Sequence, residues 1–233
     1  MASRLHSYTI KRTLRIVATV VGSLALVSAI AFAFVRVFSI SRVEVDGQGM
    51  SIELDKAKLG ENLLFVPTDR LRHDLLAAYP LLGAVRFEKQ YPGTLIIHLI
   101  KRQPFALLVS RGATYALDAS GVVLDNAVST GAYPILEFDV GSLAIGSIVP
   151  DPRVKASLAF LQALHGVLPI ARLGTRDTSS ILAVMEHTNI FLPQTGDLRA
   201  KADTLQTIIE GFRIKGTLPT VIDLRFQKPI VTN

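Results

Sequence analysis

The sequence predicts an α+β protein made of an N-terminal transmembrane helix, a small strand-helix-helix-strand-strand unit, and a mixed β-rich domain with two helices. Three observations support this class: one long uncharged apolar run, a mixture of helical and alternating periodicity after it, and a later series of short alternating segments interrupted by two amphipathic stretches. The predicted bounds are 1–15 for a cytoplasmic tail, 16–35 for the transmembrane helix, 38–103 for the small unit and 104–233 for the β-rich domain.

Residues 16–35 carry no charge and are rich in Val, Ala, Leu and Ile. A helix of this length spans about 30 Å, the thickness of the hydrocarbon core of a bilayer. A cleaved signal peptide is the alternative, because Ala31-Phe32-Ala33 matches an A-x-A cleavage site. The apolar run is longer than the usual h-region of about 7 to 15 residues, which favours an uncleaved anchor.

The positive charge of the chain is concentrated before this anchor. Four of the 25 basic residues lie within 1–15, and the remainder has 21 basic against 19 acidic residues. The basic flank predicts a cytoplasmic N-terminus, with the C-terminal domain outside the plasma (inner) membrane. The near neutrality of the remainder excludes a broad nucleic-acid-binding surface.

The anchor also has small residues at helical spacing, namely Ala18, Gly22, Ala25 and Ala29. Such a stripe lets a second transmembrane helix approach closely. Alanine is also common in anchors that have no partner helix, so both interpretations stay open.

The small unit is predicted from its periodicity. Alternation over 40–46 predicts a strand that ends at Gly47, and helices are expected over 52–59 and after Pro67. Two further strands flank the turn Tyr91-Pro92-Gly93. The periodic apolar positions predict a core of Val43, Val45, Leu71, Leu75, Val85, Phe87, Leu95, Ile97 and Leu99.

Several motifs together resemble those of one protein family. They are Ile40-x-x-Val43-x-Val45-x-Gly47, Gly60-x-Asn62-Leu63, Tyr79-Pro80, Tyr91-Pro92-x-Thr94-Leu95-x-Ile97, Arg102-x-Pro104, Asp118-x-x-Gly121 and Ile222-Asp223-Leu224-Arg225-Phe226. This set resembles the FtsQ/DivIB family of bacterial cell-division proteins, which have a single N-terminal anchor, a POTRA domain and a β domain. The resemblance makes 38–103 a POTRA domain and 104–233 an FtsQ-type β domain.

In the β-rich domain, alternating segments predict strands over 105–109, 114–117, 122–124, 134–138, 181–186 and 190–192, with a last strand from 221 into 226. Asp151 followed by Pro152 is typical of a helix start. A second amphipathic helix is expected over 198–212.

No catalytic motif is present. The sequence has no Ser-x-x-Lys, no G-x-S-x-G, no H-E-x-x-H and no phosphate-binding loop, and it has no cysteine. The five histidines are scattered along the chain. We therefore expect no enzyme activity, no cofactor and no metal.

The last strand is the predicted partner-binding site. Pro229 cannot donate to a central ladder, so this end of the strand is expected at a sheet edge. Lys228 and Pro229 either protect that edge or flank an edge that accepts a partner strand. The resemblance favours the second alternative, because the partner FtsB docks beside this strand in the FtsQ family. The expected binding residues are Arg225, Phe226, Gln227, Lys228 and Ile230, with Arg225 and Phe226 on opposite faces.

The resulting functional expectation is a non-enzymatic bitopic scaffold of the divisome at the septum. The resemblance implies FtsB/FtsL-type bitopic partners and septal peptidoglycan synthesis proteins. The alternative is a POTRA-containing docking component of an export or envelope-assembly machine, since POTRA modules also dock substrates by strand addition.

Overall fold

The computed structural model describes residues 2–47, 52, 59–125, 133–177, 179–214 and 216–232, with side chains from residue 17 onward except that of residue 31. Backbone contacts divide the chain into two compact units. The N-terminal unit comprises 1–77 and 84–100, and the C-terminal unit comprises 78–83 and 101–233. Together they confirm the predicted α+β class.

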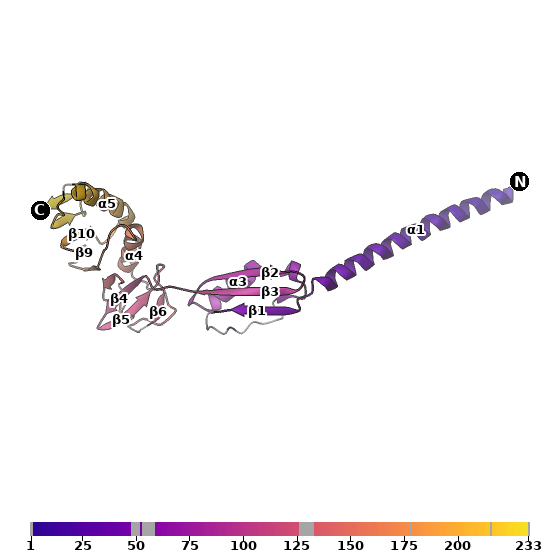
Figure 1. Ribbon diagram of the computed structural model, residues 1–233, viewed down its shortest axis with the longest axis horizontal. Coiled ribbons are helices and arrows are strands. Elements are labelled where there is room, and N and C mark those ends of the chain that lie inside the picture. The colour runs from indigo at the N-terminus through magenta and orange to yellow at the C-terminus, as the bar shows by residue number, and fades with distance from the viewer. Residues whose placement is uncertain are drawn as a thin grey trace. The chain divides into compact units, whose positions relative to one another are not determined.

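The N-terminal unit begins with the long helix α1, Ala2–Val37 (Figure 1). Within α1, Val17–Val37 is long and apolar enough to cross a membrane, and its described side chains are not buried against protein. A bilayer core requires that the backbone N–H and C=O groups of a spanning segment be hydrogen-bonded within the protein. An α-helix meets this requirement, and the exposed apolar side chains of this one suit contact with lipid.

The rest of this unit is a three-stranded sheet with one described helix, α3, Thr68–Ala78. The strand order is β1 (Arg42–Asp46), β3 (Thr94–Lys101), β2 (Leu82–Gln90), and β1 runs parallel to β3. A short 3-10 helix, η1 (Leu63–Phe65), precedes α3 and is capped by Asn62, whose Oδ1 accepts from the Leu64 N–H. The helix predicted over 52–59 lies largely outside the described residues.

Six of the nine predicted core residues of this unit are buried: Leu71, Leu75, Val85, Leu95, Ile97 and Leu99. Val43 and Phe87 are half-buried, and the prediction for Val45 is wrong, because this side chain is 41% exposed. Val45 has only β3 as a neighbouring strand. Val85 lies in the other edge strand, β2, but it is beside α3, whose Arg72 donates to the Val85 carbonyl.

The C-terminal unit contains a nine-stranded sheet in the order β12-β11-β10-β9-β8-β7-β4-β5-β6. The strands are β4 (Ala106–Ser110), β5 (Ala113–Leu117), β6 (Val123–Asp125), β7 (Ile135–Glu137), β8 (Arg172–Thr175), β9 (Ser180–Met185), β10 (Thr188–Pro193), β11 (Val221–Asp223) and β12 (Ile230–Thr232). Parallel pairs β4/β7, β7/β8 and β10/β11 are mixed with antiparallel neighbours.

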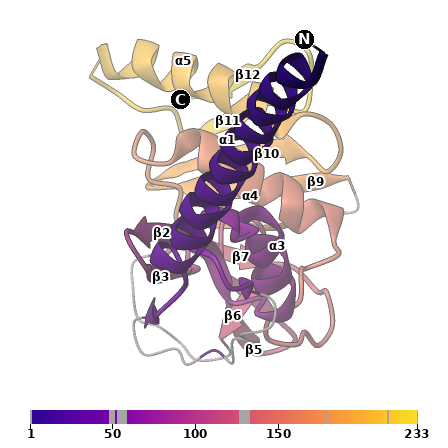
Figure 2. The same cartoon turned by 90° about the vertical axis from the view of Figure 1, so that its right-hand side faces the viewer.

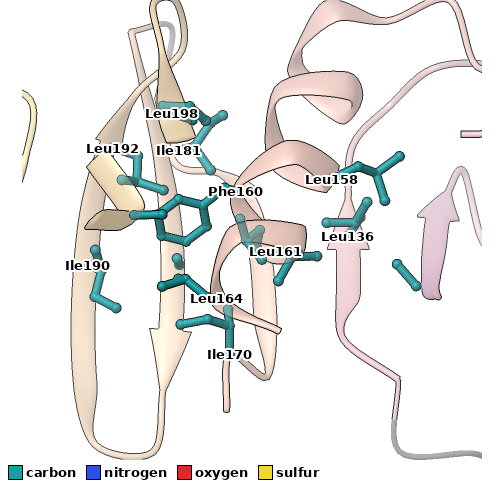
Figure 3. Packing of buried hydrophobic residues seen from close by; sticks show 14 of the residues in the cluster. Leu136, Leu158, Phe160, Leu161, Leu164, Ile170, Ile181, Ile190, Leu192 and Leu198 are labelled. Carbon is teal, nitrogen blue, oxygen red and sulfur yellow. The ribbon is translucent and has the colours of Figure 1, made fainter. Parts of the chain in front are cut away.

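Two helices pack on one face of this sheet: α4 (Pro152–Leu164) and α5 (Leu198–Ile214). Asp151 caps α4 as predicted, with its carboxylate accepting from the Arg153 N–H at 2.8 Å. Figure 3 shows Phe160, Leu161 and Leu164 of α4 against strand residues such as Ile190. Figure 2 shows β10, β11 and β12 beside α5.

Three of the family-like motifs meet inside the C-terminal unit, those that contain Pro80, Arg102 and Asp118. Arg102 donates from Nη1 to Asp118 Oδ2 at 2.5 Å and from Nε to the Pro80 carbonyl at 2.8 Å. Burial alone would raise the pKa of Asp118, but hydrogen bonds from Ser120, the Val122 N–H and Arg102 lower it below its ordinary value. Arg102 thus joins the segment 78–83 to the turn after β5.

Three features of this unit differ from the sequence prediction. The last strand was expected to continue into Phe226, but β11 ends at Asp223. The chain then turns, and β12 returns antiparallel to β11, so the hairpin contains an edge strand that was not predicted. Strand β8 was also not predicted, because Arg172-Leu-Gly-Thr is short and contains a glycine.

Candidate partner-binding edge

Strand β12 is the terminal strand of the large sheet. It pairs with β11 on one side, and within the described ranges no strand pairs with its other side. One register row crosses four strands of this sheet. It contains Ile230 of β12, Asp223 of β11, Phe191 of β10 and Leu182 of β9. Residues in one register row share a face. This row lies on the face opposite α4 and α5, because the alternate row contains the buried Ile222, Ile190 and Ala183.

The predicted site residues lie in the loop before β12 and at its start. Gln227 and Lys228 are exposed, and Phe226 and Ile230 are 53% and 55% exposed. The loop is held at two points: the Leu224 N–H donates to the Phe191 carbonyl at 2.8 Å, and Lys201 Nζ donates to the Phe226 carbonyl at 3.0 Å. The structure therefore presents two large apolar side chains beside the terminal strand.

Arg225 has a different environment from the one expected. Arg225 and Phe226 were expected on opposite faces of a strand, but both follow the end of β11 and neither belongs to a strand. The Arg225 guanidinium donates to Asp223 from Nε at 3.0 Å and from Nη2 at 2.6 Å, and it also lies over the ring of Phe191. This hydrogen-bonded pair lowers the pKa of Asp223 and raises that of Arg225, so both groups stay charged at neutral pH.

Sequence reasoning missed two residues that gather at Arg225, namely Arg176 and Phe191. The Arg176 guanidinium stacks over the Phe191 ring at 4.7 Å from its centroid, and Arg225 approaches the same ring at 5.3 Å. Within the described residues, Arg176 forms no ion pair with a carboxylate, whereas Arg225 is paired with Asp223. The alternation in β10 could have indicated that Phe191 faces away from the helices, but only the fold brings Arg176 to it.

A hydrogen-bonded turn follows Arg176. Hydrogen bonds from the hydroxyl of Ser180 and from the N–H and hydroxyl of Ser179 lower the pKa of Asp177 to about 2. Asp177 therefore stays ionised, and its charge helps to raise the pKa of Arg225. We call Arg176, Phe191, Arg225 and Phe226 the basic-aromatic cluster, in which two guanidinium groups lie over aromatic rings.

The four small residues of the anchor lie on α1, spaced four, three and four residues apart, and all four are exposed. A side chain built at Gly22 would meet nothing within 4 Å. The described part of the chain therefore leaves this stripe uncovered.

The described residues contain no group of three or more His, Asp or Glu side chains that could hold a metal ion. His98 bonds to Asp46 and Glu88 through different ring nitrogens, and His165 stacks against Phe105. One cavity of the C-terminal unit is lined mainly by apolar residues, among them Pro104, Phe105, Pro134 and 167–171, with Tyr133 and His165 also in its wall.

No known family model matches the sequence. Two curated proteins are similar to it, both called cell division protein FtsQ. The protein of Mycobacterium leprae is 27% identical over 178 residues, which cover 75% of this chain and 50% of that protein. The protein of Mycobacteroides abscessus is 24% identical over 184 residues, which cover 76% of this chain and 57% of that protein.

This chain is similar to FtsQ. The similarity agrees with the family resemblance of the motifs and with the N-terminal apolar helix. The chain spans about half the length of the curated relatives it matches.

Proposed function

We propose that this protein is a non-enzymatic, single-pass membrane scaffold of bacterial cell division that recruits and regulates partner membrane proteins at the septum. The similarity to two FtsQ proteins supports the division role. A helix suited to cross a membrane, followed by two folded units, supports the bitopic architecture. In this proposal 38–103 is a POTRA domain and 104–233 is an FtsQ-type β domain.

The proposed topology has the N-terminus in the cytoplasm and the part of the chain that follows α1 outside. The basic residues before the apolar span support this orientation, because positive flanks are retained on the cytoplasmic side. In this arrangement the stripe Ala18, Gly22, Ala25 and Ala29 is available to a partner helix. A Gly22→Leu change should weaken helix association in a membrane two-hybrid assay, and Val20→Leu on the opposite side of α1 should not.

The single observation that carries the partner-binding proposal is the unpaired edge of β12 beside the basic-aromatic cluster. A partner strand added to this edge gains main-chain hydrogen bonds, and pockets beside it give specificity. Phe226 and Ile230 provide exposed apolar area, and Arg176 provides a cation for an acidic side chain. The proposed occupant is the extracytoplasmic segment of a small bitopic protein of the FtsB/FtsL type.

Fluorescence imaging of a functional fusion tests the division role. The proposal predicts enrichment at the septum and loss of division when the protein is depleted. A uniform distribution around the cell envelope, with normal division after depletion, would contradict the proposal and favour a different envelope function.

A further inference from the structure

The residues that follow α1 are bonded directly to two loops of the N-terminal unit. Phe38 comes immediately after α1, and its carbonyl oxygen accepts from the Leu63 N–H at 2.8 Å. The Ile40 N–H donates to the Glu61 carbonyl at 3.0 Å, and the Ser41 N–H donates to the Gly93 carbonyl at 2.9 Å. The loops 60–65 and 91–93 therefore lie where the chain leaves α1.

These loops present exposed aromatic side chains. Phe65 is 78% exposed and Tyr91 is 59% exposed. The Tyr91 ring meets the Phe38 ring edge to face at 5.6 Å between centroids, and Phe38 lies 4.7 Å from Phe34 of α1. The aromatic surface is thus continuous with the apolar surface of the span.

The length of the span places this surface in the headgroup layer. A helix of the 21 residues Val17–Val37 is about 31 Å long, which matches a hydrocarbon core of about 30 Å. The headgroup layer on each side is about 5 to 8 Å thick. Phe38 follows the span by one residue and Tyr91 contacts it, so both fall within this layer.

We propose that loops 60–65 and 91–93 form a membrane-contact collar, in which Phe38, Phe65 and Tyr91 enter the headgroup layer of the bilayer that holds α1. Tyrosine is enriched at this depth because its ring is apolar while its hydroxyl reaches water, and the two phenylalanines add apolar area at the boundary with the acyl chains. Phe65 is the last residue of η1, and the first residue of η1, Leu63, donates its N–H to the Phe38 carbonyl. Phe65 and Leu63 are separated by about 4 Å along the axis of this 3-10 helix. The collar rests on the proposed membrane anchor and is independent of the proposed role in division.

Two cations lie beside the collar among the residues that the structure describes. Lys89 Nζ donates to the Leu64 carbonyl at 3.1 Å, and the guanidinium of Arg36 lies over the Phe32 ring in the last turns of α1. Both cations suit lipid phosphates, while Glu61 in the same loop opposes them. Because the collar continues the surface of the anchor, its occupant is the surrounding lipid.

The chain contains no tryptophan, which permits single-tryptophan fluorescence of the full chain in vesicles. Phe65→Trp and Tyr91→Trp place the probe in the collar, and Leu26→Trp places it near the middle of the span. The matched control is Arg86→Trp, an exposed position on β2 about 16 Å along the chain from Tyr91. Vesicles are made with lipids brominated either high or low on the acyl chain.

The collar predicts blue-shifted emission of the Phe65→Trp and Tyr91→Trp variants and quenching of both by the shallow bromines. Leu26→Trp should be quenched best by the deep bromines, and Arg86→Trp by neither. If Phe65→Trp and Tyr91→Trp resemble Arg86→Trp while Leu26→Trp is quenched, the collar is refuted and the anchor stands. If Leu26→Trp is not quenched, the anchor proposal fails and the collar fails with it.

Discussion

The guanidinium of Arg225 donates three hydrogen bonds of 2.6 to 3.2 Å to the carboxylate of Asp223, the last residue of β11. The Arg225 N–H also donates to Asp223 Oδ1 at 3.0 Å. This local pair closes the end of the strand and directs the chain toward β12. Asp223 is 8% exposed, so its charge depends on Arg225 for compensation.

Arg225→Glu should therefore lower the melting temperature, because it places a second carboxylate beside the buried Asp223 and removes the cation that compensates it. Arg225→Ala should lower it less, since it removes the partner without adding a charge. Thermal unfolding followed by circular dichroism measures both. Lys228→Ala, at an exposed position in the same loop, is the control and should leave the melting temperature unchanged. Equal melting temperatures for all three variants would show that the ion pair does not stabilise this turn.

Arg176→Glu should weaken partner binding without destabilising the protein. Its guanidinium stacks on Phe191 and forms no ion pair within the described residues, so it remains available to a partner carboxylate. We expect at least a tenfold loss of affinity, about 1.4 kcal/mol, in a calorimetric titration. Arg199→Glu makes the same charge change on α5 and should bind normally. Unchanged affinity of Arg176→Glu would remove the basic-aromatic cluster from the interface.

Ile97→Ala in β3 should reduce the free energy of unfolding of the N-terminal unit by about 2 to 5 kcal/mol, because Ile97 is fully buried and a cavity would remain. Val45→Ala in the neighbouring β1 should cost less than about 1 kcal/mol, because Val45 is 41% exposed. Urea unfolding of a fragment that begins at residue 38 compares the two. Equal costs would mean that the packing of this sheet differs from that described.

The stability of the N-terminal unit should fall as the pH rises. Hydrogen bonds to Glu88 and then Asp46 raise the pKa of His98 above its ordinary value of 6.5. The folded unit therefore holds a proton that the unfolded chain releases. The stabilisation from protonated His98 is present below about pH 6.5 and is lost as the pH rises through the pKa of His98 in the folded unit. His98→Gln should flatten the dependence between pH 6 and 8 in thermal unfolding, and an unchanged slope would assign the effect to other groups.

Sequence patterns predicted the elements that have clear periodicity or punctuation. The core positions Leu71, Leu75, Leu95 and Ile97 follow from spacing, and the start of α4 follows from Asp151-Pro152. The hairpin of β11 and β12 could not be predicted, because alternation through Arg225 and Phe226 imitates a continuous strand. What ends the strand is the bond of Arg225 to its near neighbour Asp223, and this depends on the local backbone rather than on periodicity.

The sheet edge was predicted from the sequence, but the side chains that gather beside it were not. Pro229 indicated a sheet edge, and the edge strand begins at the next residue. Arg176 follows β8 and Phe191 lies in β10, and β9 separates these two strands in the sheet. The Arg176 side chain therefore reaches across β9 to stack on Phe191. Spacing in the sequence does not predict this contact, because the order of the strands in the sheet brings the two residues together.

Photo-crosslinking from the edge strand in living cells tests the central claim most directly. A photoreactive phenylalanine analogue replaces Ile230, which is 55% exposed at the start of β12, and in a control it replaces Ile145, which is 50% exposed. The proposal predicts one discrete adduct from position 230, identified by mass spectrometry as a small bitopic protein, and its absence from position 145. No adduct from position 230 in a protein that still supports division, or the same adducts from both positions, would contradict partner binding at β12.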